Sequence, residues 1–126
     1  MRVFVYYNLH KHCWSVKALT GENKGRVIHH AAVVTLRDVV GKVSEAGRQR
    51  VLKEKKKNVH AGIVGTLVST DAMPPSDVLR TAMRPLTYNP YRYSTFVDKD
   101  TQEAFEGGSM AFMYNRQVFV PLNEEN

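Results

Sequence analysis

Apolar and polar positions alternate along the N-terminal third of the chain. Residues 2–8 and 13–19 follow this alternation and are rich in β-branched and aromatic side chains, which favours extended strands. Residues 20–25 (TGENKG) have the glycines and the asparagine that are typical of a tight turn. Residues 26–39 supply further strand sequence, with a break or a bulge near His29–Ala31. The pattern predicts roughly three or four antiparallel strands in this region.

The pattern changes over residues 44–57 (SEAGRQRVLKEKKK), where Ser44 is placed to cap a helix. The apolar side chains of this helix are few: Ala46, Val51 and Leu52. A helix with so narrow an apolar stripe must lie on the surface, with most of its circumference in water. Residues 58–70 then alternate with apolar or small residues on both faces, which indicates a central, covered strand. Its interior glycines indicate a bulge or a close approach by another backbone or a ligand.

Shorter elements are expected in the C-terminal half. Turn-forming prolines precede a short helix over about residues 76–83. Residues 84–98 are extended in pattern, with a turn at Asn89–Pro90. Residues 109–122 have the pattern of a closing hairpin that turns near Asn115–Arg116.

Length and composition limit the fold class. A chain of 126 residues with 43% hydrophobic composition can bury one core, so we expect a single domain over residues 1–126 with a frayed tail at 123–126. The expected class is α+β: mainly antiparallel sheet, one basic surface helix at about 44–57 and a second short helix at about 76–83. We expect neither a transmembrane helix nor a secretory signal, because no apolar run is long enough. The single Cys13 excludes an internal disulfide and suits a reducing cytoplasm.

Charge is distributed unevenly along the chain. The formal net charge is +6, but residues 1–57 hold 13 Lys or Arg against 4 Asp or Glu, whereas residues 58–126 hold 5 against 8. Six cations belong to the predicted basic helix: Arg48, Arg50, Lys53, Lys55, Lys56 and Lys57. Closely spaced cations match a phosphate backbone, and their binding gains from counterion release. The alternative is a charged helix that is only solvated.

A second candidate binding segment is RPLTYNPYRYSTF, residues 84–96. Aromatic and guanidinium side chains interleave in it: Arg84, Tyr88, Tyr91, Arg92 and Tyr93. Aromatic rings beside guanidinium groups can stack on unpaired bases. Tyr and Arg are equally the favoured anchors of protein interfaces. Some of these rings can instead close the core, which is what we expect of Phe96.

Two alternatives involve histidine chemistry. A metal site would use side chains close in sequence: His10, His12 and Cys13. A structural zinc site normally needs two well-spaced ligand pairs, and only one thiol is present. A small metal-free nuclease would use His29, His30 and His60 if the strands 26–39 and 58–70 pair. Phosphate-binding and nucleophile-elbow motifs are missing from the sequence, so we expect no cofactor and a protein that is not an enzyme.

The stretches VYYNLHKHCWSV, SEAGRQRVLKEKKKNVHAGIVG and YNPYRYSTFVD resemble small accessory proteins of tailed bacteriophages. The resemblance covers most of the chain and transfers no functional residue. It implies a bacterial cytoplasm and a role in host takeover or counter-defence. We therefore expect a small basic protein that binds nucleic acid or a nucleoprotein complex and has no membrane partner. The sequence does not predict its oligomeric state. The second hypothesis is a protein inhibitor that occludes a host or defence enzyme, as anti-CRISPR proteins do, and the third is the histidine nuclease.

Overall fold

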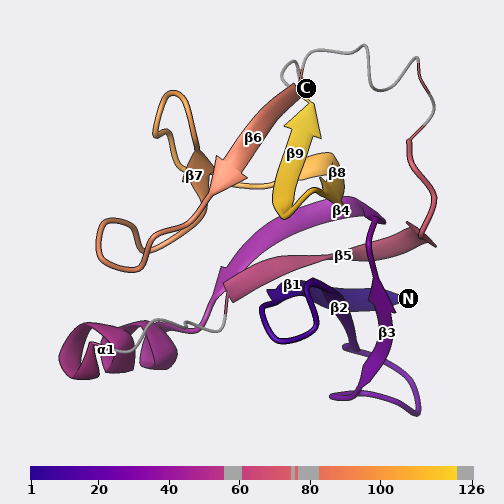
Figure 1. Cartoon of the computed structure of the whole chain (residues 1–126), viewed down its shortest axis with the longest axis horizontal. Coiled ribbons are helices and arrows are strands. Elements are labelled where there is room, and N and C mark those ends of the chain that lie inside the picture. Colours follow the sequence, from indigo (N-terminus) through magenta and orange to yellow (C-terminus); the bar gives the residue numbers. More distant parts are fainter. Residues whose placement is uncertain (56–60, 75, 77–82, 122–126) are drawn as a thin grey trace.

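The computed structural model describes residues 1–55, 61–74, 76 and 83–121. Within this part, a single nine-stranded sheet has the strand order β3-β2-β1-β5-β4-β8-β9-β6-β7 (Figure 1). Every neighbouring pair of strands is antiparallel. The strands are β1 (Arg2–Asn8), β2 (Cys13–Ala18), β3 (Val27–Ala31), β4 (Val34–Val43), β5 (Ala61–Thr70), β6 (Met83–Thr87), β7 (Val97–Asp98), β8 (Gly108–Tyr114) and β9 (Gln117–Pro121). With the helix α1 (Glu45–Glu54), they confirm a mainly antiparallel α+β fold with one helix.

The sheet is strongly curved. Its two longest strands, β4 and β5, have ten residues each and join an N-terminal half (β1–β3) to a C-terminal half (β6–β9). Figure 1 shows the two halves on opposite sides of this pair. The Arg116 guanidinium carbon, in the β8–β9 turn, lies 5.0 Å from the ring centroid of Tyr7 on β1. Because β5 and β4 separate β1 from the β8–β9 hairpin in the sheet, only curvature can bring these residues together.

The core fills the concave side and draws on both halves of the sheet. Its fully buried members include Val3, Val5, Leu36, Ile63 and Met113. Glycines on β5 permit the close packing, because a Cβ on Gly62 would clash with the Val5 carbonyl oxygen. A Cβ on Gly65 would lie 2.9 Å from Leu36 Cβ. The close backbone approach expected from the glycines of this strand is therefore confirmed.

The helix α1 projects from one end of the sheet, between β4 and β5 (Figure 1). Ser44 caps it as predicted, since its Oγ accepts a hydrogen bond of 3.1 Å from the Gly47 N–H. The helix ends earlier than predicted, because Lys55 adopts a left-handed conformation with φ of 57°. Lys56 and Lys57 lie outside the described residues. Among the described residues, no helix is long and apolar enough to cross a membrane.

The connection between β3 and β4 lies later than predicted. Strand β3 continues through Ala31, and the break falls at Ala32–Val33. Asp71, directly after β5, stabilises this connection through two hydrogen bonds. Its carboxylate accepts one of 3.0 Å from the Ala32 N–H, and its own N–H donates one of 2.7 Å to the Val33 carbonyl. The carboxylate of a residue far along the chain therefore fixes a turn that local pattern misplaced.

In the C-terminal half, the structure describes the predicted hairpin but little of the predicted short helix. The closing hairpin is confirmed as β8 and β9, with positive φ at both Asn115 and Arg116. The short helix expected over 76–83 falls mostly outside the described residues, and Met83 already belongs to β6. The tail at 123–126 also lies outside them.

Candidate nucleic-acid interface

The outward face of α1 is cationic. Val51 is the buried residue of this helix and is 1% exposed, so its side of α1 packs against the rest of the protein. Arg50 and Lys53 lie on the solvent side and are exposed, as is Lys55 at the end of the helix. Residues three positions apart are neighbours on a helix surface, so Arg50 and Lys53 form a pair of adjacent charges.

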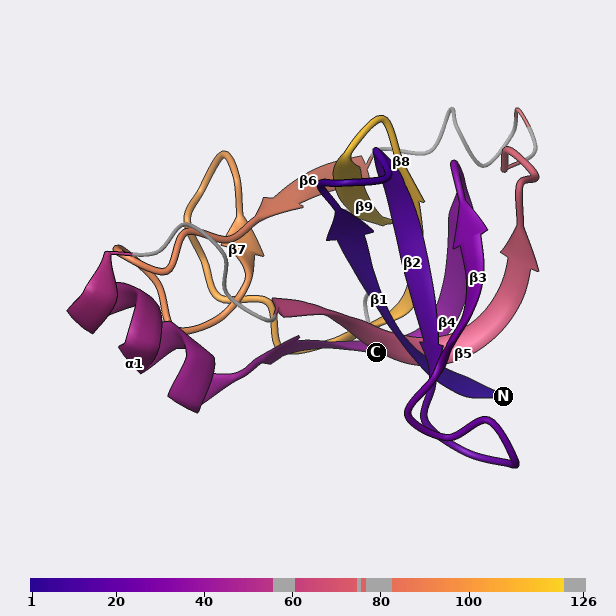
Figure 2. The same ribbon diagram turned by 60° about the horizontal axis from the view of Figure 1, so that its bottom comes forward.

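Arg48 connects α1 to the other predicted binding segment. Its Nε–H donates a 3.0 Å hydrogen bond to the Tyr93 carbonyl, and its Nη1 lies 3.5 Å from the Glu45 carboxylate. The Arg48 side chain is only 18% exposed. Figures 1 and 2 both show the loop after β6 beside α1. The structure thus brings the two predicted segments together, and Arg48 serves as the contact between them.

A compact turn shapes residues 89–93. The Asn89 side-chain oxygen accepts a hydrogen bond of 2.9 Å from the Tyr91 N–H, and the Asn89 carbonyl accepts from the Arg92 and Tyr93 N–H groups at 3.0 and 2.8 Å. The turn predicted at Asn89–Pro90 is confirmed. It leaves Tyr91 55% exposed and places the Arg92 guanidinium carbon 5.5 Å from the Tyr93 ring centroid.

Tyr88 faces inward from the same segment. Its ring packs on Phe96 with 5.4 Å between centroids, and Phe96 is 8% exposed, as expected of a core residue. The Tyr88 hydroxyl is buried, and Arg48 is the cation beside it. Burial raises the pKa of Tyr88, while the positive charge of Arg48 acts in the opposite direction. Tyr88 is therefore a neutral phenol at physiological pH.

Arg84 lies in an ion pair rather than on the cationic surface. Its Nη1 is 3.6 Å from the carboxylate of Asp98, which is 3% exposed. Burial alone would raise the pKa of Asp98, but the N–H groups of Asp100 and Thr101 and the charge of Arg84 outweigh it and lower the pKa. This pair joins β6 to β7 at the two ends of the second predicted binding segment, residues 84–96.

We use the name cationic end for the exposed side chains that this arrangement gathers around α1 and the turn: Arg50, Lys53, Lys55, Tyr91 and Arg92. Their positions combine adjacent positive charges with an exposed aromatic ring. Chemically, such a surface can neutralise phosphates and stack on an unpaired base.

Sequence comparison places the chain among bacteriophage proteins. A family profile described as "Mycobacterium phage L5 gene 82 protein" matches residues 1–121. The chain belongs to this family. It is 44% identical over 124 residues to the "Gene 82 protein" of Mycobacterium phage L5, covering 94% of each chain. No solved structure matches it. The resemblance to bacteriophage proteins is confirmed.

The histidines of this gene 82 family member are dispersed. Strand β3 carries His29 and His30, but β2 and β1 lie between β3 and β5 in the sheet. The pairing that the nuclease hypothesis required therefore forms only between β4 and β5, without His29 or His30. His30 Nδ1 instead lies 3.1 Å from Ser15 Oγ. His60 lies outside the described residues.

The cluster His10, His12 and Cys13 does not form a metal centre in the described part of the chain. In residues 1–55, 61–74, 76 and 83–121, no three His, Cys, Asp or Glu side chains come together in a way that could hold a metal ion. His10 and His12 are exposed, and Cys13 is half-buried at the start of β2.

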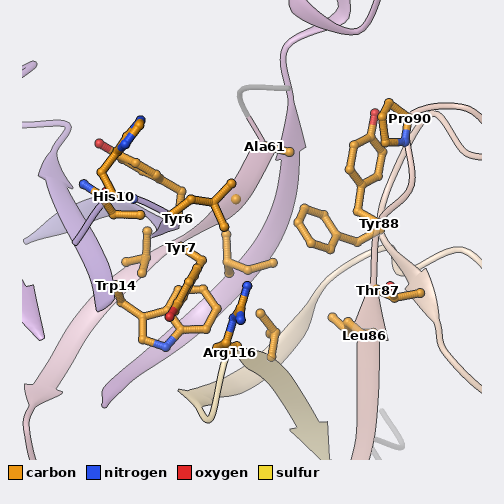
Figure 3. A pocket seen from close by; sticks show the side chains of 17 residues that line it. Tyr6, Tyr7, His10, Trp14, Ala61, Leu86, Thr87, Tyr88, Pro90 and Arg116 are labelled. Atoms are coloured by element: carbon orange, nitrogen blue, oxygen red, sulfur yellow. The ribbon is translucent and has the colours of Figure 1, made fainter. Parts of the chain in front are cut away.

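A pocket of about 710 Å³ on the concave side of the sheet was not predicted from the sequence. Figure 3 shows Tyr7 and Trp14 on one side of it and Tyr88 on the other, with Arg116 at its edge. The pocket exists because the sheet curves β1 toward the β8–β9 turn. No local pattern marks these residues as neighbours, although aromatic residues on two separate strands were visible in the sequence.

Proposed function

We propose that this member of the gene 82 family is a non-enzymatic accessory protein that binds nucleic acid through the cationic end, in the cytoplasm of the bacterial host. The observation that carries the proposal is the 3.0 Å hydrogen bond from Arg48 to the Tyr93 carbonyl. It holds a helix with adjacent exposed cations beside a turn with an exposed tyrosine and arginine.

The cationic end suits a single strand better than a duplex. Arg50 and Lys53 supply the sequence-independent phosphate contacts that dominate nucleic-acid affinity. The half-exposed Tyr91 ring offers a stacking surface, and only an unpaired base presents its face to such a ring. We therefore expect single-stranded DNA or RNA to bind more tightly than the matching blunt duplex.

Salt dependence tests this proposal. For a single strand, the slope of log affinity against log salt is about −0.7 for each phosphate neutralised. The double variant Arg50→Gln/Lys53→Gln should make the slope less steep by about 1.4 and weaken binding at low salt. The matched control is Lys24→Gln/Arg26→Gln, which removes the same charges from the exposed β2–β3 loop, far from α1 in Figures 1 and 2.

Equal losses of affinity in the two double variants would reduce the effect to net charge and contradict a localised interface. No binding to DNA or RNA at low salt, or binding that does not depend on salt, would overturn the proposal. A stoichiometric protein partner that is retained from host lysate after nuclease treatment, with no nucleic-acid binding, would favour the inhibitor hypothesis instead.

A further inference from the structure

The concave pocket is a second candidate site, separate from the cationic end. It lies between β1 and β6, with β5 residues Ala61, Gly62 and Ile63 also lining it. Its volume of about 710 Å³ is within the range of about 300–1,000 Å³ that small-molecule sites occupy. It is a structural consequence of sheet curvature that the proposed function does not use.

Two aromatic pairs form its opposite walls (Figure 3). On the β1–β2 side, the rings of Tyr7 and Trp14 meet edge to face at 5.3 Å between centroids. On the β6 side, Tyr88 packs on Phe96 at 5.4 Å. A flat ring that enters between these walls can contact aromatic surfaces on both sides, which favours a planar ligand over an aliphatic one.

The charged groups at the pocket favour an anion. Arg116 lines it with its guanidinium carbon 5.0 Å from the Tyr7 ring centroid. No Asp or Glu is among the described residues that line the pocket. A guanidinium group pairs with phosphate through two parallel hydrogen bonds and is the usual choice for that purpose.

An unpaired polar atom on one wall indicates a ligand that is polar at its edge. The Trp14 indole Nε1 is buried and has no hydrogen-bond partner within the described part of the chain. The indole N–H can only donate, so its partner must be an acceptor. Nucleobases carry ring-nitrogen and carbonyl acceptors around a flat aromatic ring.

We propose that the pocket holds a nucleobase, with the attached phosphate at Arg116. The base is supplied either by a free mononucleotide or by an unpaired base of a single strand. The pocket is independent of the cationic end, because a mononucleotide can fill it whether or not α1 contacts a strand.

Trp14 provides a direct probe, because it is the single tryptophan of the chain. We expect AMP, GMP, CMP or UMP to change Trp14 fluorescence saturably and to shift its indole N–H resonance in a ¹H–¹⁵N spectrum. The corresponding nucleosides should act more weakly, because they lack the phosphate. Inorganic phosphate should leave the indole resonance in place.

Matched variants separate the two contacts. Arg116→Gln should weaken mononucleotide binding about tenfold, since a hydrogen bond to a charged group is lost, and should leave nucleoside binding unchanged. Its control is Arg26→Gln in an exposed loop. Tyr7→Leu should weaken both ligands about tenfold through lost stacking. Its control is Tyr114→Leu, whose ring stacks on Phe119 rather than lining the pocket.

A short single-stranded oligonucleotide and its blunt duplex distinguish the two sources. A larger response of Trp14 to the single strand than to mononucleotides, with none to the duplex, would assign the base to a strand. A response to mononucleotides alone would assign a free nucleotide. The Arg50→Gln/Lys53→Gln variant should still bind mononucleotides. A result that contradicts strand binding by the cationic end is therefore distinguishable from one that contradicts nucleotide binding in the pocket.

Three results would overturn the proposal. One is an unchanged indole resonance with mononucleotides and single strands at millimolar concentration. Another is an equal response to inorganic phosphate, which would indicate an anion contact alone. The third is an Arg116→Gln variant that binds mononucleotides as tightly as wild type. If Tyr7→Leu fails to fold, the wild-type spectrum and the Arg116→Gln variant still decide the matter.

Discussion

The cationic end and the concave pocket are held in place by different means. The helix that carries Arg50 and Lys53 is anchored by one buried side chain, Val51, and by the hydrogen bond from Arg48 to Tyr93. One pocket wall belongs to β1 and β2, whose side chains continue into the main core, and Tyr88 on the other wall packs against the same core directly after β6. Leu36 is fully buried between the two halves of the sheet. The cationic end is therefore held on the sheet by few contacts, whereas the pocket is part of the packed core.

This difference predicts how each site fails. A site held by few contacts can open locally at a free energy below that of global unfolding. The pocket wall formed by β1 and β2 can be lost only when the sheet unfolds. The two regions should therefore respond separately to substitutions that target their supports.

The largest effect is expected from Leu36→Ala. Leu36 is completely buried in the core between β5 and β8, so its truncation should lower the free energy of unfolding by about 2–5 kcal/mol. Urea denaturation followed by Trp14 fluorescence measures the change, and the pocket and α1 should be lost in the same transition. Leu9→Ala, at a 49% exposed position, is the control and should change stability by no more than about 0.5 kcal/mol. Similar losses in both variants would contradict a core centred on the concave side.

A smaller, local effect is expected from Val51→Ala. Removing two buried methyl groups should cost about 1.5 kcal/mol, and the cost should fall on the attachment of α1 rather than on the sheet. In hydrogen exchange, the amides of α1 should exchange faster while those of β1 and β5 keep their protection. Val68→Ala, the same substitution at a 51% exposed position on β5, should leave both sets unchanged. Faster exchange across β1 and β5 in Val51→Ala would show that the helix and the sheet unfold as one unit.

The same contrast explains what the sequence could predict. The cap at Ser44, the hairpin turn at Asn115–Arg116 and the central position of the strand before Thr70 follow from local patterns, and the structure confirms them. These features depend on residues near one another in the chain. The gathering of Arg50 and Tyr91 into one end depends on a hydrogen bond between distant segments, which no local pattern encodes.

The pocket was harder to foresee for a related reason. Tyr7 and Arg116 meet only because the sheet curves across the two intervening strands, β5 and β4. Curvature depends on where bulges and glycines lie on several strands at once. Strand β4 has such an irregularity between Arg37 and Val40, where Asp38 has a φ of 51°. A non-glycine residue in that conformation is not visible in a pattern of apolar and polar positions.

The smallest expected effect is a pH dependence of stability that arises at Asp98, just after the predicted binding segment of residues 84–96. The pKa of Asp98 in the folded protein lies below its ordinary value of 3.8, so the folded state binds fewer protons than the unfolded state near that pH. The stabilisation is therefore fully present above about pH 5 and is lost as the pH falls through the folded pKa. In thermal unfolding measured between pH 7 and pH 2.5, the Tm of the wild type should fall with pH as this stabilisation is lost. Asp98→Asn should make that fall in Tm less steep, whereas Asp100→Asn, at an exposed position, should retain the wild-type steepness. A pH dependence of wild-type steepness in Asp98→Asn would mean that the Asp98 carboxylate, with its Asp100 and Thr101 N–H partners and Arg84, contributes nothing to holding the segment on the sheet. The attachment of the cationic end would then depend on Arg48 and Val51 alone.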